Sequence, residues 1–95
     1  MGFFDSYFGS SGKYPKDEHQ LSSQKIKELV SRYKVQSLDS SEEGLVENTI
    51  ISRRLGDGKI SLFQIYEALT KLKNQNKISR QDRDGLMRVF EEYFN

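Results

Sequence analysis

The 95-residue sequence contains no cysteine. This absence excludes disulfide bonds, thiolate zinc sites and cysteine nucleophiles, and it agrees with a reducing compartment. No run approaches the about 18 apolar residues that a membrane span needs, and the N-terminus lacks the basic flank and long apolar stretch of a secretory signal. We therefore expect a soluble protein of the cytoplasm.

The charges of the chain are almost balanced, with 15 basic and 14 acidic residues and a net charge of +1. No global field therefore draws the protein toward nucleic acid or acidic membranes. A chain of this length forms one domain and buries only about 60 to 65% of the surface that it exposes when unfolded. Because little room is left for an internal cavity, we expect any binding to occur on the surface.

The first part of the chain differs in composition from the rest. Residues 1–20 contain the only proline, five aromatic residues and no aliphatic residue after Met1. This composition predicts a mostly irregular N-terminal tail. Residues 21–95 form the second part, in which apolar residues recur at helical spacing.

Four segments of residues 21–95 show the periodicity of amphipathic helices. In the first, Ile26, Leu29, Val30 and Tyr33 fall at i, i+3, i+4 and i+7, which is one face of a helix. No segment alternates with period two for long enough to predict a strand. The sequence therefore predicts an all-α fold, a compact bundle of four short helices. The predicted core consists of residues on the apolar faces: Ile26, Leu29, Val30, Leu45, Ile50, Ile65, Leu69, Leu72, Leu86 and Phe90.

Serines stand at the predicted starts of these helices. Three of them are followed at the third position by a polar acceptor, the spacing of a capping box. Gly85 is the one awkward residue, because a glycine inside a helix costs about 1 kcal/mol relative to alanine. Its presence indicates a close approach between helices or a late start of the last helix. The predicted N-caps are Ser22, Ser40 with Glu43, Ser61 with Gln64, and Ser79 with Asp82.

The stretch GDGKIS, residues 56–61, is similar to the middle of a calcium-binding EF-hand loop. Such a loop needs oxygen ligands at positions 1, 3, 5 and 12 around a glycine at position 6. With Gly58 at position 6, the ligand positions 1, 3 and 12 fall on Arg53, Leu55 and Gln64. These residues do not suit a hard cation, so we interpret the stretch as a helix stop, a turn and a helix start.

Catalytic and metal-binding patterns are scarce in this sequence. His19 is the only histidine, and no cysteine or spaced carboxylate pair completes a metal site around it. The close carboxylate pairs, Asp82 with Asp84 and Glu91 with Glu92, lie near helix ends, whereas acid–base catalysis needs a sheltered cleft. No phosphate-binding loop or nucleophile elbow appears. We expect a protein that is not an enzyme and binds no cofactor or metal.

Nucleic-acid binding is one alternative function. Residues 60–79, ISLFQIYEALTKLKNQNKIS, resemble the end of a winged-helix recognition element, with Gln64 or Asn74 as the base contact. A wing needs a β-hairpin after Ile78, and the residues that follow have a helical pattern instead. The same cations also suit a solvated face beside the acidic second helix. The phosphate contacts of this alternative would be Lys71, Lys73, Lys77, Arg80 and Arg83.

A second alternative comes from residues 62–94, an apolar helix, an NKI turn and a closing amphipathic helix. This layout is similar to the enterocin A-type immunity proteins, small cytoplasmic four-helix bundles that protect a bacterium from its own bacteriocin. The chain length and the lack of cysteine agree with that family, whereas the aromatic N-terminal tail departs from its pattern. The resemblance implies a bacteriocin-immunity function.

The aromatic tail carries the last candidate site. Phe3, Phe4, Tyr7 and Phe8 fall at i, i+1, i+4 and i+5, so one and a half helical turns would gather the four rings on one side. Such a segment suits docking into a partner groove or lying at a membrane surface. Our main expectation is a non-catalytic helical interaction module, a bacterial adaptor or regulator, that binds a protein through an exposed helix face or this tail.

Overall fold

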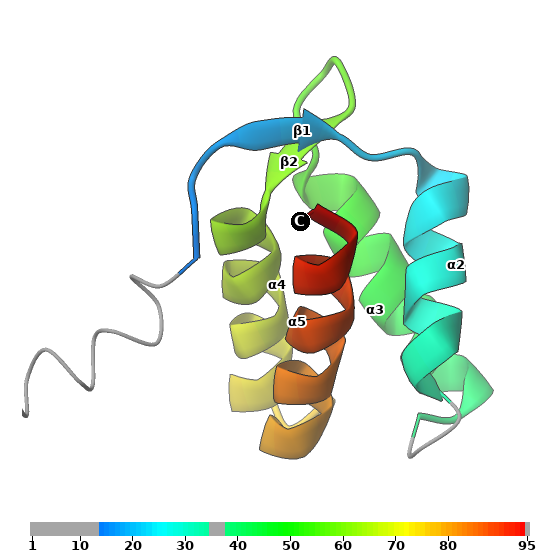
Figure 1. Cartoon of the computed structure of the whole chain (residues 1–95). Helices are drawn as coiled ribbons and strands as arrows, with labels where there is room; N and C mark the ends of the chain where they lie inside the picture. Colours follow the sequence, from blue (N-terminus) through cyan, green and yellow to red (C-terminus); the bar gives the residue numbers. More distant parts are fainter. Residues whose placement is uncertain (1–13, 35–37, 95) are drawn as a thin grey trace, which may run out of the picture.

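Four helices pack in a ring in the computed structural model, which describes residues 14–34 and 38–94. Contacts join each helix to the next one in the chain, and α5 closes the ring against α2 (Figure 1). The predicted all-α bundle is therefore confirmed, with one small sheet added to it. The elements are β1 (Glu18–Gln20), α2 (Ser23–Lys34), α3 (Ser40–Arg53), β2 (Lys59–Ser61), α4 (Leu62–Asn74) and α5 (Arg80–Phe94).

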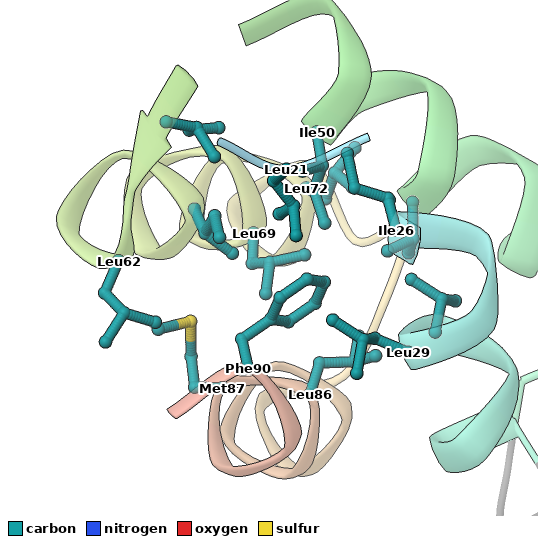
Figure 2. Packing of buried hydrophobic residues seen from close by; sticks show 14 of the residues in the cluster. Leu21, Ile26, Leu29, Ile50, Leu62, Leu69, Leu72, Leu86, Met87 and Phe90 are labelled. Atoms are coloured by element: carbon teal, nitrogen blue, oxygen red, sulfur yellow. The ribbon is translucent and has the colours of Figure 1, made fainter. Parts of the chain in front are cut away.

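The core lies at the centre of the ring. Figure 2 shows the ring of Phe90 pointing from α5 into this core, toward Leu69 of α4. Of the ten residues predicted for the core, nine are buried. Leu45 was wrongly included, since 37% of it is exposed while α3 buries Val46 and Ile50. The core also contains Leu21, Leu38, Val46, Ile60, Leu62, Ile78 and Met87.

The starts of α4 and α5 have the capping boxes that the sequence predicts. At α4, the Gln64 amide donates to Ser61 Oγ at 3.1 Å, and the Ser61 amide donates to Gln64 Oε1 at 2.9 Å. At α5, Ser79 and Asp82 exchange the same two bonds, at 3.0 and 3.2 Å. Ser22 also caps α2, because its Oγ accepts from the Lys25 amide at 3.0 Å. These bonds satisfy amides that have no partner inside the helix.

The start of α3 lies one residue earlier than predicted. The sequence indicated Ser40 with Glu43 as the capping pair, but the N-cap is Asp39. The Glu42 amide donates to Asp39 Oδ1 at 2.8 Å, and the Asp39 amide donates to Glu42 Oε1 at 3.0 Å. Both pairs have the same spacing, so the spacing alone could not distinguish them.

The prediction that the chain contains no strand is wrong. β1 and β2 pair antiparallel, with Glu18 opposite Ser61 and Gln20 opposite Lys59. The Leu21 amide continues this ladder by donating to the Gly58 carbonyl at 3.1 Å. Each strand has only three residues, too few for a period of two to stand out in the sequence.

The N-terminal strap, residues 14–20, crosses one end of the bundle (Figure 1). It lies within the stretch that the sequence assigned to an irregular tail. Tyr14 packs against the core, and the Phe63 amide donates to the Pro15 carbonyl at 3.1 Å. Within residues 14–34 and 38–94, no helix combines the length and apolarity needed to cross a membrane.

Candidate functional site

An open depression of about 760 Å³ lies between α2 and α5. Sites for small molecules commonly bury 70 to 90% of the ligand surface, and a depression this open to solvent does not enclose a ligand to that degree. It suits contact with another macromolecule better. We call its lining residues the α2–α5 face: Arg32, Tyr33, Gln81, Asp84, Gly85, Arg88, Val89 and Glu92.

Tyr33 and Gly85 hold the two helices together beneath this face. A Cβ atom added to Gly85 would overlap with Cε1 of Tyr33 and lie 2.8 Å from its Cδ1. The Tyr33 hydroxyl donates to Asp82 Oδ1 at 2.9 Å, and only 4% of Asp82 is exposed. Because α5 begins at Arg80, Gly85 lies inside the helix and marks a close approach, the first of its two predicted explanations.

Four charged residues follow one another along α5 at intervals of four. They alternate in sign, and each is exposed. Within residues 14–34 and 38–94, the side chains of the arginines and the glutamate of this set make no ion pair or hydrogen bond. Asp84 Oδ1 accepts from Arg83 Nε at 3.1 Å. We call this set the α5 charge row, and it consists of Arg80, Asp84, Arg88 and Glu92.

Most of the cations proposed for nucleic-acid binding lie near one end of the bundle, where α4 connects to α5 (Figure 1). Lys73 is half-buried and the other three are exposed. They come from the last turn of α4, the connecting loop and the first residue of α5: Lys71, Lys73, Lys77 and Arg80.

Two residues of the nucleic-acid alternative are engaged elsewhere. The guanidinium of Arg83 lies 5.1 Å from the centre of the Tyr66 ring, and its Nη1 donates to Thr70 at 3.4 Å. Only 12% of the Arg83 side chain is exposed. Gln64, one of the two proposed base contacts, uses its side chain to cap α4. The structure therefore presents four of the five predicted cations and turns the fifth toward α4.

The aromatic cluster predicted at Phe3, Phe4, Tyr7 and Phe8 lies outside the described residues. The strap that follows them begins at Tyr14, whose ring is 5.1 Å from that of Tyr66.

Tyr14 lies partly buried in a negatively charged neighbourhood. Burial raises the pKa of its hydroxyl above the usual 10.0, and the carboxylates of Glu91 and Asp84 raise it further. All these effects disfavour the charged phenolate.

Residues 14–34 and 38–94 contain no group of three or more histidine, aspartate or glutamate side chains that could hold a metal ion. His19 is exposed on β1, with its ring 5.3 Å from that of Phe94. In the turn that resembles a calcium loop, Asp57 Oδ1 accepts from the Lys59 amide at 3.2 Å. The turn is closed by its own backbone and by Gly58, whose φ of 83° is accessible to glycine.

Comparison of the chain with protein-family models, curated proteins and solved structures gives no match. The sequence pattern placed Tyr33 on the apolar face of a helix and Glu92 in a carboxylate pair, and it did not point to Arg32 or Arg88 as site residues. A signal was present in the alternating charges of residues 80–92, but the cations were interpreted as one basic segment that ended at Arg83.

Proposed function

We propose that the protein is a non-catalytic helical interaction module that binds a protein partner on the α2–α5 face. The observation that carries this proposal is the open depression between the two helices, which α2 and α5 line with charged, aromatic and apolar side chains. Interfaces between proteins are enriched in tyrosine and arginine, often at the residues that contribute most to affinity. Arg32, Tyr33 and Arg88 supply both types.

The arrangement of buried polar groups supports a non-catalytic role. Among the described residues, the buried polar side chains are those of Ser61 and Asp82. Each of them caps a helix, so each already has a structural task. General acid–base catalysis requires a sheltered acid and a sheltered base with separate pKa values. Ser61 and Asp82 do not form such a pair.

A capture experiment with matched variants tests the proposal. The full chain is immobilised, exposed to an extract of its host, and compared with Arg88→Asp on the face and Lys27→Asp on the exposed side of α2. Both variants replace one exposed cation by an anion. We expect a specific protein to be retained by the wild type and by Lys27→Asp, and to be lost with Arg88→Asp. Equal capture by both variants would contradict the proposed site.

A nucleic-acid function is the second candidate, because four exposed or half-exposed cations gather at the α4–α5 end. If it is correct, affinity for DNA or RNA falls steeply with salt, with a log–log slope of about −0.9 for each phosphate contacted. A flat salt dependence would exclude it. The immunity-protein alternative predicts a four-helix bundle as well, and its test is protection of a bacteriocin-sensitive strain by expression of the chain.

A further inference from the structure

The charges of the α5 charge row alternate in sign along the helix. From the N-terminal to the C-terminal end, the charges are positive, negative, positive and negative, and all four side chains are exposed. Residues four apart on a helix are neighbours and form a continuous ridge. When this ridge is followed in the opposite direction, every charge meets the opposite sign.

We propose that a second copy of this chain docks antiparallel along α5, with a two-fold axis between residues 84 and 88. In this arrangement Asp84 faces the partner's Arg88, and Arg80 faces the partner's Glu92. The two-fold axis repeats each pair, as in any isologous interface. The inference rests on the proposed interaction function of the α2–α5 face and names its occupant.

The charges also select the register. If one copy shifts along the other by four residues, Arg88 faces the partner's Arg88 and Asp84 faces the partner's Glu92. Like charges then meet at three of the four positions, and Arg80 loses its counterpart, which disfavours that alignment. The proposed register is the one that satisfies all four positions at once.

The residues beside the row line the open depression between α2 and α5. Gly85 lies close to the proposed axis, and the ring of Tyr33 fills the space beside it. Val89 is half-buried next to it, and Tyr33 lines the same depression. The exposed ion pairs fix the direction and register, whereas the depression provides the contact area, because exposed pairs contribute little by themselves.

The three unpaired members of the row make this arrangement accessible without breaking existing contacts. Within the described part of the chain, the side chains of Arg80, Arg88 and Glu92 are free of ion pairs and hydrogen bonds. Asp84 accepts from Arg83 through Oδ1, so its second carboxylate oxygen can face the partner. Because the pairs are exposed, the dimer should weaken at about 1 M salt, where the Debye length is about 3 Å.

Sedimentation equilibrium of the full chain over a range of concentrations tests the inference. We expect the average mass of the wild type to rise toward that of a dimer. Asp84→Arg and Arg88→Asp each place like charges opposite one another twice, so each variant alone should dissociate at least tenfold more readily. Lys27→Asp, which changes a cation on another face, should behave as the wild type does.

Two combinations distinguish charge pairing from loss of structure. An equimolar mixture of Asp84→Arg and Arg88→Asp restores opposite charges across the axis, so it should form a heterodimer. The double variant Asp84→Arg/Arg88→Asp should recover self-association. A wild type that stays monomeric, or a mixture that does not associate, overturns the inference. If the wild type stays monomeric but captures a different protein in a manner that depends on Arg88, the proposed function stands and only the identity of the occupant is overturned.

Discussion

Gly44 in α3 and Gly85 in α5 are the same residue type inside helices with opposite surroundings. A Cβ atom at Gly44 would meet no atom within 4 Å, whereas one at Gly85 would overlap with the Tyr33 ring. Both glycines carry the same intrinsic cost for a helix. Of these two glycines, only Gly85 is required by packing. Whether a helical glycine can be replaced therefore depends on how closely a neighbouring helix approaches it.

The difference between enclosed and open positions should change the free energy of unfolding most when a leucine is replaced. Leu69→Ala should lower the free energy of unfolding by about 2 to 5 kcal/mol, because it leaves a cavity in the core. Leu45→Ala should lower it by only about 0.5 kcal/mol, since this side chain is partly exposed. Chemical denaturation of both variants measures the difference, and an unchanged transition for Leu69→Ala would show that the core is misplaced.

Gly85→Ala should destabilise the protein by about 1 to 3 kcal/mol, because the added methyl group forces Tyr33 to move. The effect should depend on the tyrosine. In a Tyr33→Ala background the space is open, so the same glycine replacement should become neutral or stabilising. Thermal denaturation of the four proteins in this cycle provides the measurement. Equal penalties with and without the tyrosine ring would refute the close contact.

Gly44→Ala should have the opposite sign and stabilise the protein by up to about 1 kcal/mol, because alanine favours the helix and meets no neighbour. The expected observation is a higher thermal midpoint. A lower midpoint would indicate that something approaches this side of α3 in solution.

The smallest effect concerns the strap. The pKa of Tyr14 is raised in the folded protein, so this group contributes stability below about pH 10, its ordinary pKa. That contribution is lost as the pH rises through the raised value. The difference in stability between the wild type and Tyr14→Phe should therefore change with pH only above about pH 10. Ultraviolet titration of tyrosinate should show one late-titrating group fewer in the variant.

Local signals in the sequence predicted most of the helical architecture. Ser61 and Ser79 show why, because a capping box depends on residues only three positions apart, and both boxes formed as expected. The apolar face of α2 is similarly local. At α3 two candidate caps with identical spacing were adjacent, and Leu45 was assigned to the core beside the correctly predicted Ile50, so Ser40 and Leu45 were misplaced.

Features that join distant parts of the chain were not predictable in the same way. The strand pair connects residues 18–20 with 59–61, and the bond from Tyr33 to Asp82 spans 49 positions. Neither leaves a periodic mark in its own segment. Gly85 indicated either a close approach of helices or a late helix start, and only the fold shows that Tyr33 lies against it. The α5 charge row was present in the sequence, yet its meaning depends on which side of α5 is exposed.

The pairing of β1 with β2 has a consequence for local opening. Its two strands close a long loop that contains α2 and α3, and they lie at one end of the bundle rather than in its centre. Segments of this kind open as small cooperative units while the rest of a protein stays folded. The Phe63 amide, bonded to Pro15, should therefore exchange its hydrogen with solvent faster than the Phe90 amide, whose exchange requires the whole bundle to come apart.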